Sequence, residues 1–166
     1  MKDTGGTARL DQLDLKILAK LQADARITNQ DLADAVGLSP SPCLQRVKRL
    51  EKTGIIASYR VQIDLDSVCR YVDVIAAVTL NSHGLDDFAN FERAVAGMRY
   101  VAECTKVSGA IDYFVRFICP DIGAYQMLSD ELLRLGPKVG NLSSHVVLNT
   151  VKPFTGITLD DLVSAP

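Results

Sequence analysis

The sequence predicts an α+β protein built from an N-terminal helix-turn-helix unit and a C-terminal ferredoxin-like βαββαβ domain. Apolar residues recur at helical spacing in three short segments between residues 11 and 53, with Gly and Pro between the segments. Residues 71–151 then alternate between stretches rich in Val and Ile and stretches with helical periodicity. The balance of charge also changes sign near residue 60, which supports a division into two parts.

The formal net charge of −2 over 166 residues conceals this change of sign. Residues 1–60 carry ten Lys/Arg against seven Asp/Glu, a balance of +3, whereas residues 61–166 carry eight against thirteen, a balance of −5. The basic excess is concentrated in residues 45–60, where it reaches +4. A basic segment is typical of a nucleic-acid interface, although a solvated helix face can carry the same charge.

The first predicted helix spans about 11–24, because four apolar residues share one face: Leu13, Ile17, Leu18 and Leu21. A second helix of about two turns begins after Thr28, a residue type favoured at the N-cap, and ends at Gly37. A third helix begins at Ser39-Pro40 and ends at Gly54, since proline is tolerated at the first helical position. Two short helices joined by a glycine-containing turn are typical of a helix-turn-helix, whose second helix enters the DNA major groove.

The third helix carries the candidate DNA-binding residues. Leu44, Val47 and Leu50 are expected to face inward, while the small residues at its start, Cys43 among them, would allow close approach to DNA. Gln45 and the residues before it would lie near base edges, and the basic residues near phosphates. The candidates are Ser41, Pro42, Gln45, Arg46, Lys48, Arg49 and Arg60.

Residues 55–64 alternate partly between apolar and polar types and predict a strand that links two domains, 1–63 and 64–166. The second domain follows the order βαββαβ of the ferredoxin-like fold. Its expected elements are strand 71–80, helix 85–98, strand 100–107, strand 112–119, helix 122–135 and strand 142–151, followed by a tail from 155.

The first strand of that domain is apolar on both faces, whereas both helices of this fold cover one face only. The open face should therefore be buried against another subunit, so that a homodimer is the minimum assembly.

Nothing in the sequence indicates catalysis, since it contains no Walker loop, no HExxH and no GxSxG motif. His83 beside Gly84 is expected only to cap the following helix. The four cysteines lie 26, 35 and 15 residues apart, which fits free thiols better than metal ligands or a disulfide framework. We expect no cofactor, no metal and no catalytic residue. The apolar run Val74–Val78 is too short to cross a bilayer and residues 1–9 are polar, so we expect a cytoplasmic protein without a signal peptide.

Several motifs between residues 10 and 153 resemble the Lrp/AsnC (feast/famine) family of transcriptional regulators, and look closest to its leucine-responsive branch. The motifs are Leu10-Asp11 with Asp14, Arg26-Ile27, the segment 37–51 followed by Gly54-Ile55-Ile56, Glu103-Cys104, and Val107-Ser108-Gly109 with Asp112-Tyr113. The resemblance implies an N-terminal winged helix-turn-helix, a linking strand, and a C-terminal domain that forms dimers and then octamers or other multimers.

The resemblance also implies a small effector, usually an amino acid, bound between dimers partly through the turn between the second and third strands. An α-amino acid needs an anion for its ammonium and donors for its carboxylate, which Asp112 and the N–H groups around Gly109 would supply. Alternatively, Gly109 provides only a permissive backbone and Asp112 only caps a hairpin turn. In relatives the last strand of a neighbouring subunit contributes as well. The candidates are Gly109, Ala110, Ile111, Asp112, Ser144 and His145.

The sequence thus predicts a regulator that binds double-stranded DNA and responds to a small effector. Two alternatives remain at this point. A sirohaem-decarboxylase-like enzyme shares the fold of the family and would bind a coloured tetrapyrrole. A ligand-sensing module that does not bind DNA fits the C-terminal half but leaves Arg46, Lys48 and Arg49 without a role.

Overall fold

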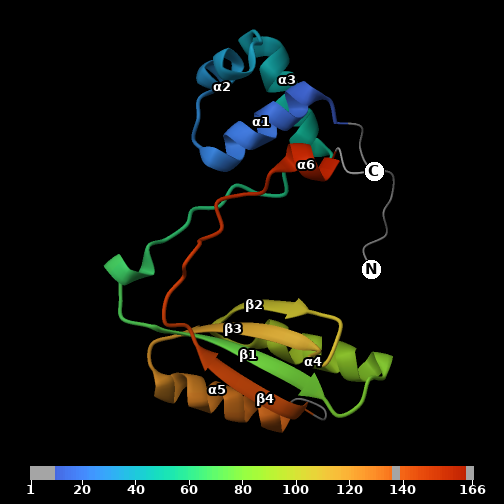
Figure 1. The fold of residues 1–166 in the computed structure, drawn as a ribbon, viewed down its shortest axis with the longest axis vertical. Helices are drawn as coiled ribbons and strands as arrows, with labels where there is room; N and C mark the ends of the chain where they lie inside the picture. The colour runs from blue at the N-terminus through green and yellow to red at the C-terminus, as the bar shows by residue number, and fades with distance from the viewer. Residues whose placement is uncertain (1–9, 136–138, 164–166) are drawn as a thin grey trace. The chain divides into compact units, whose positions relative to one another are not determined.

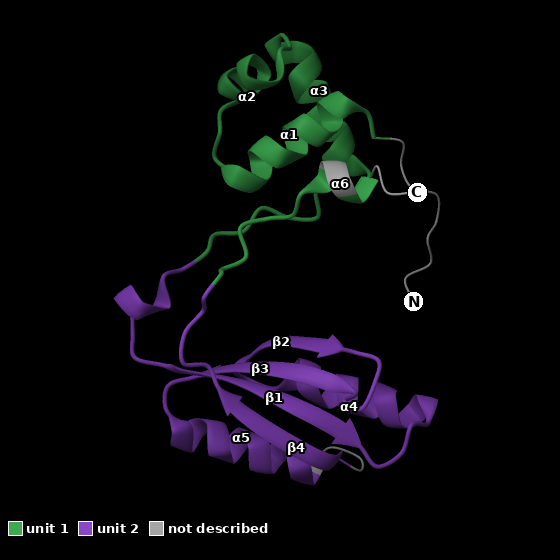
Figure 2. Ribbon diagram, viewed as in Figure 1, with its two compact units in different colours: residues 1–62, 152–166 green, residues 63–151 purple. Residues whose placement is uncertain are grey.

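The computed structural model describes residues 10–135 and 139–163, and the chain divides into two compact units (Figures 1 and 2). The second unit comprises residues 63–151, and the first comprises the chain before it together with the segment from Lys152. The sequence assigned this C-terminal segment to the second domain. Its described part instead packs with the first unit, where the side-chain amide of Gln22 donates to the carbonyl of Ile157 and accepts from its N–H.

The first unit contains four helices in its described part: α1 (Gln12–Ala23), α2 (Asn29–Val36), α3 (Pro40–Lys52) and the short α6 (Leu159–Val163). The Thr28 side chain accepts from the Asp31 N–H and caps α2, while Gly37 ends α2 with φ of 75°. The three helices expected from the sequence are therefore confirmed. Their shared core consists of Ile17, Leu18, Leu32, Ala33, Val36, Cys43 and Leu50.

The buried stripe of α3 differs from the predicted one by one residue. Cys43 is fully buried, whereas Leu44, expected inside, is 41% exposed. The helix therefore packs through Cys43, Val47 and Leu50, at spacings of four and three residues, which keeps the stripe on one side of a 3.6-residue helix. The prediction that Cys43 lines the DNA-facing surface is wrong.

The predicted linking strand is also wrong. Residues 57–64 belong to no helix or strand, and a 3₁₀ turn, η1 (Leu65–Ser67), follows them. A strand requires a neighbour that accepts and donates its backbone hydrogen bonds, and the described chain supplies none beside this segment.

The second unit has the predicted βαββαβ order: β1 (Val72–Leu80), α4 (Leu85–Gly97), β2 (Val101–Lys106), β3 (Tyr113–Cys119), α5 (Ile122–Leu135) and β4 (Val139–Val146). The four strands form one antiparallel sheet in the order β2-β3-β1-β4. This is the ferredoxin-like arrangement. The last strand ends five residues earlier than predicted, because its partner β1 begins at Val72.

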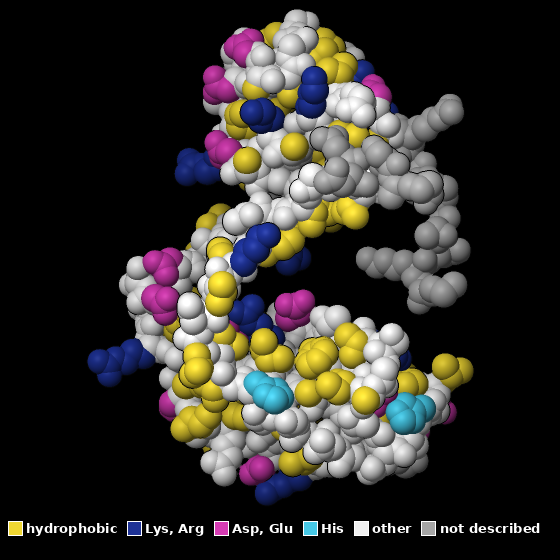
Figure 3. Space-filling model, viewed as in Figure 1, with side chains coloured by type: hydrophobic (Ala, Val, Ile, Leu, Met, Phe, Trp, Pro, Cys, Tyr) yellow, Lys and Arg dark blue, Asp and Glu magenta, His cyan; other side chains and the backbone are white. Residues whose placement is uncertain are grey.

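The sheet has one face covered by helices and one without them. Alternate residues of β1 and β3 meet α4 and α5 in a core that includes Val74, Val78, Phe91, Tyr113, Phe117 and Leu132. The intervening residues, among them Ile75, Ala77, Phe114 and Arg116, lie on the other face, which neither helix of this unit covers. The prediction that β1 is apolar on both faces is confirmed. Hydrophobic side chains gather over this unit in the space-filling view (Figure 3).

Candidate functional site

The helix-turn-helix geometry follows from local sequence chemistry. Three residues, 37–39, connect α2 to α3, and the left-handed conformation of Gly37 is one that glycine adopts without steric cost. Pro40 then occupies the first turn of α3, where its missing N–H removes no helical hydrogen bond. Ser39 stands at the N-cap, but its side chain makes no capping hydrogen bond.

Most of the candidate DNA-binding residues lie on the exposed surface of α3. The exposed ones are Ser41, Pro42, Gln45, Lys48 and Arg49, joined by Arg60 in the segment that follows the helix. Arg46 differs from them, since its side chain is only 28% exposed and turns toward α1. Lys and Arg side chains are visible on this unit together with Asp and Glu (Figure 3).

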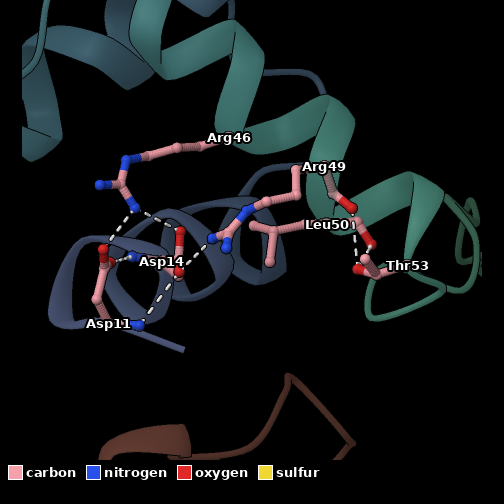
Figure 4. A network of polar contacts seen from close by, with 6 residues as sticks. All are labelled: Asp11, Asp14, Arg46, Arg49, Leu50 and Thr53. Carbon is pink, nitrogen blue, oxygen red and sulfur yellow. Dashed lines mark hydrogen bonds and ion pairs between the residues drawn. The ribbon is translucent and has the colours of Figure 1, made fainter. Parts of the chain in front are cut away.

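A network of four charged side chains joins α3 to the start of α1 (Figure 4). Arg46 Nη1 donates to Asp11 Oδ2 at 2.7 Å and to Asp14 Oδ1 at 2.8 Å. Arg49 Nη2 donates to the other oxygen of Asp14 at 2.5 Å. The two acids also form a capping box at the start of α1, in which each side chain accepts the backbone N–H of the other.

Burial and pairing act in opposite directions on Asp14, whose side chain is 1% exposed. Burial alone would raise the pKa of Asp14, but hydrogen bonds from Arg49, the Asp11 N–H and Arg46 lower it below its ordinary value of 3.8. The same pairing raises the pKa of Arg46. Asp14 is therefore an ionised carboxylate inside the unit. The sequence contained a signal for the capping box in the spacing of Asp11 and Asp14, but none for partners more than thirty residues away.

The candidate effector turn connects β2 to β3. Gly109 has φ of 123°, a conformation that favours glycine. Asp112 is buried, and its Oδ2 accepts the backbone N–H of Leu80 at 2.8 Å. The N–H of Asp112 donates to the carbonyl of Val78 at 3.0 Å. Asp112 therefore links the turn to the end of β1. This structural role is close to the alternative in which Asp112 only caps the hairpin turn.

The other oxygen of Asp112 has a more exposed partner. His83 Nε2 lies 3.2 Å from Asp112 Oδ1, and the His83 side chain is 59% exposed. His83 was expected to cap α4, but Gly84 occupies that N-cap position and the Asp87 carboxylate accepts its N–H. The pairing of His83 with Asp112 was not anticipated, because 29 residues separate the two in the sequence.

Ser144 and His145 do not join the turn within one chain. They lie opposite Ala76 and Ile75, three to four residues along β1 from Thr79, which contacts the turn at the Ala110 carbonyl. At about 3.3 Å per residue the separation along the sheet is on the order of 10 Å. Ser144 bonds to the Tyr125 hydroxyl on the helix-covered face, whereas His145 lies on the open face beside Ser143.

A cavity of about 360 Å³ lies between α4 and β2. Its polar lining includes Glu92, Lys106 and Tyr113, and these groups are already paired: Glu92 Oε1 accepts from the Tyr113 hydroxyl at 2.7 Å and from Lys106 at 3.4 Å. Within residues 10–135 and 139–163, no three His, Cys, Asp or Glu side chains are grouped to hold a metal ion. All four cysteines are free thiols, as predicted. No described helix is long and apolar enough to cross a membrane.

Two family models match the chain. A model of winged helix-turn-helix DNA-binding domains matches residues 10–57, and a model described as the Lrp/AsnC ligand binding domain matches residues 73–157. These ranges correspond closely to the two compact units, apart from the C-terminal segment.

Proteins of known sequence and structure agree with these models. The transcriptional regulatory protein DoeX of Halomonas elongata is 40% identical over 157 residues, covering 94% of this chain and 99% of its own. The leucine-responsive regulatory protein of Escherichia coli is 41% identical over 144 residues, covering 86% and 87%.

Solved structures show the same fold. An AsnC family regulator from Agrobacterium tumefaciens has a TM-score of 0.83 at 31% identity, covering 92% of this chain and 99% of its own. A transcriptional regulator from Neisseria meningitidis, solved as an L-Met complex, has a TM-score of 0.84 at 32% identity, covering 93% and 99%. The chain belongs to the Lrp/AsnC family of transcriptional regulators, with a winged helix-turn-helix DNA-binding domain followed by a ligand-binding domain.

Proposed function

We propose that this protein regulates transcription in the cytoplasm by binding double-stranded DNA through α3 and responding to an amino-acid effector, without catalysing a reaction. The observation that carries the proposal is the exposed polar and basic surface of α3 within a helix-turn-helix. Paired α3 helices of a dimer would enter successive major grooves about one helical turn apart on a pseudo-palindromic site. Neither tetrapyrrole chemistry nor sensing without DNA gives this basic helix a role.

The residues of this interface fall into two groups. Ser41, Pro42 and Gln45 would approach base edges, because they stand near the N-terminal end of α3. Arg46, Lys48, Arg49 and Arg60 would lie on phosphates, which fix the orientation of the protein on DNA but carry no sequence information.

Salt-dependent DNA titrations test this interface. Lys48→Ala should weaken binding to all duplexes alike and reduce the slope of log K against log salt by about 0.9, the value for one phosphate contact. Lys16→Ala on α1 serves as the matched control, since it removes the same charge from the same unit but from outside α3. Unchanged affinity and slope in Lys48→Ala would argue against this surface of α3 as the phosphate-binding one.

We propose that the effector binds at the turn of residues 109–112, with Ser144 and His145 contributed by a neighbouring subunit. The Asp112 carboxylate would take the effector ammonium through Oδ1, which lies beside the exposed His83, while Oδ2 stays on the Leu80 N–H. N–H groups around Gly109 would take the carboxylate. The Neisseria relative solved with L-Met supports an amino acid as the effector class.

A thermal-shift screen against the twenty amino acids tests the effector site, because a ligand that binds only the folded state raises the melting temperature. Asp112→Asn is the informative variant, since its amide oxygen still accepts the Leu80 N–H while the negative charge is lost. We expect the shift to disappear in Asp112→Asn and DNA binding to persist without effector. Asp121→Asn, an exposed acid before α5, is the control. An equal shift in Asp112→Asn would refute this site.

We propose that the open face of the sheet pairs with a second copy of the chain, and that such dimers assemble into octamers or other multimers. The support is that the apolar side chains of Ile75, Ala77 and Phe114 lie on a face that neither helix of this unit covers. Light scattering of Phe114→Glu, whose position is 39% exposed, should show a smaller assembly than the unsubstituted protein. An unchanged molar mass would exclude this face as the interface.

A further inference from the structure

Two carboxylates share one nitrogen of Arg46 at the junction of α1 and α3 (Figure 4). Arg46 Nη1 lies 2.7 Å from Asp11 Oδ2 and 2.8 Å from Asp14 Oδ1. The two carboxylates differ in their exposure to water: the Asp11 side chain is 53% exposed and the Asp14 side chain 1%.

This difference in burial makes the two ion pairs unequal. An exposed pair contributes little to stability, because water and salt screen it and hydrate its parts when they separate. A buried carboxylate that loses its partner remains as an uncompensated charge in a poorly polarisable interior, which is costly. Asp11 can therefore release Arg46 at small cost, whereas Asp14 retains it.

The charge of α3 depends on these pairs. The sequence gives residues 45–60 an excess of four positive charges, but Arg46 and Arg49 face the negative charges of Asp11 and Asp14. In the described part of the unit, Lys48 and Lys52 form no salt bridge. The free protein thus presents a weaker positive field on α3 than its sequence suggests.

We propose that Asp11 sets the affinity for DNA by competing with a backbone phosphate for the guanidinium of Arg46, while Asp14 remains bound and holds Arg46 in position. A phosphate oxygen accepts the N–H that Asp11 releases, so the number of charge-assisted hydrogen bonds on Arg46 is unchanged. Asp11 is thus a positioning and affinity-limiting residue that acts through Arg46. The inference rests on the proposed function, since it requires α3 to lie on DNA.

The experiment is a fluorescence-anisotropy titration of a labelled 40-base-pair duplex of arbitrary sequence in increasing KCl. Such a probe suffices because phosphates are common to all sequences and dominate non-specific binding. The variant is Asp11→Asn, whose amide oxygen still accepts the Asp14 N–H that now bonds to Asp11 and so preserves the capping of α1. We expect its affinity to rise about 3- to 8-fold near 0.1 M salt, because no carboxylate then competes with phosphate for Arg46. Its salt slope should stay close to that of the unsubstituted protein, since Arg46 makes the same phosphate contact in both.

Two further variants separate this mechanism from a general change of charge. Asp24→Asn, an exposed position at the other end of α1, changes the net charge equally but lies outside the network. Arg46→Ala removes the group that Asp11 is proposed to withhold, while Asp14 keeps Arg49 as a partner. The gain from Asp11→Asn should exceed that from Asp24→Asn, and it should disappear in the Arg46→Ala background.

Each other outcome overturns the inference. Equal gains in Asp11→Asn and Asp24→Asn would reduce the effect to net charge, and a gain that persists without Arg46 would exclude the shared guanidinium. Unchanged or lower affinity in a folded Asp11→Asn would show that Asp11 does not compete with phosphate. No DNA binding by the unsubstituted protein would instead overturn the proposed function itself, and this inference with it.

Discussion

The helix-turn-helix unit and the ferredoxin-like unit bury charge in different ways. In the first unit, Asp14 lies fully buried at the contact of α1 with α3 and is held by two arginines. In the second unit, the buried acid Asp73 pairs with Arg116 on the open face of the sheet, and the buried Asp112 lies beside His83 near the turn. Its core between sheet and helices is otherwise apolar and aromatic.

The difference reflects the size of the two cores. Three short helices enclose few large side chains, and small domains bury too little apolar surface to be very stable. An ionic tie then helps to fix α3 relative to α1. In the second unit, four strands and two helices contribute side chains to one core, and close packing of these side chains fixes the helices on the sheet. The contact of the proposed DNA-binding helix with α1 thus includes a buried charge, whereas the core between the sheet and its helices is apolar.

The largest expected effect concerns the sheet core. Phe117 is fully buried and packs edge-on against Tyr125 of α5, with ring centroids 5.4 Å apart. Phe117→Ala should cost about 3–5 kcal/mol, from lost burial and the cavity left behind. Native-state hydrogen exchange should show the loss in β1 and β3 but not in α1 and α3. Leu85→Ala, at a position 89% exposed, is the control and should stay within about 0.5 kcal/mol.

The next effect concerns the ionic tie. Asp14→Asn should destabilise the first unit by about 2–3 kcal/mol, less than the ~3–5 kcal/mol typical when the remaining charge stays buried, because Arg46 and Arg49 are partly exposed and can be hydrated. Hydrogen exchange of the backbone amides in α1 and α3 measures this loss of stability. If instead α1 and α3 kept their protection, the apolar core alone would hold this unit and the contrast between the units would fail.

Two glycines, one in each unit, provide a test with a smaller expected effect. A Cβ added at either position would meet no atom within 4 Å, so that only the backbone conformation decides the outcome. Gly37 has φ of 75°, so Gly37→Ala should cost about 1–2 kcal/mol through backbone strain. Gly97 ends α4 without such a conformation, and Gly97→Ala should stabilise the second unit by about 0.4–1 kcal/mol. Urea titrations followed by hydrogen exchange should show changes in unfolding free energy of opposite sign for the two variants. Changes of equal sign would contradict the assignment of strain to Gly37.

The smallest expected effect is the pH dependence that Asp14 gives to the stability of the first unit. Because the folded pKa of Asp14 lies below its ordinary value of 3.8, the unfolded state binds more protons between the two values. The contribution of Asp14 is therefore complete above the ordinary value and is lost as the pH falls through the folded value. The stability difference between the unsubstituted protein and Asp14→Asn should shrink as the pH falls from 5 to 3. A difference that grows on acidification would mean that the pKa of Asp14 is raised.

Local patterns predicted most of the elements because their causes are local. The Thr28 cap, the left-handed Gly37 and Pro40 at the start of α3 each act within one turn of backbone, and the structure contains all three helices that they delimit. The assignment of β1 side chains to the two faces of the sheet was also correct, because successive side chains of a strand point to opposite faces. The errors arose where a local pattern was compatible with two structures. On α3, for example, Leu44 was predicted to be buried and Cys43 to be exposed, and the structure shows the reverse.

Long-range pairing was not visible in the sequence. The apolar periodicity of residues 11–24 indicated the first helix but not the two arginine partners of Asp14. The partial alternation of residues 55–64 indicated a strand, but that segment has no neighbouring strand in the described chain. The same holds for Asp112, which the sequence assigned to an effector site or a turn and which also binds the Leu80 N–H across the sheet.

The sequence by itself determined the order of the elements, the two-unit organisation and the basic character of α3, because helix caps, turn residues and hydrophobic periods act between near neighbours in the chain. Only the tertiary structure decided which charges remain available on α3, where the C-terminal segment packs and what holds Asp112. These features depend on side chains that are distant in the sequence, and on water being excluded from one carboxylate, Asp14, but not from its neighbour, Asp11.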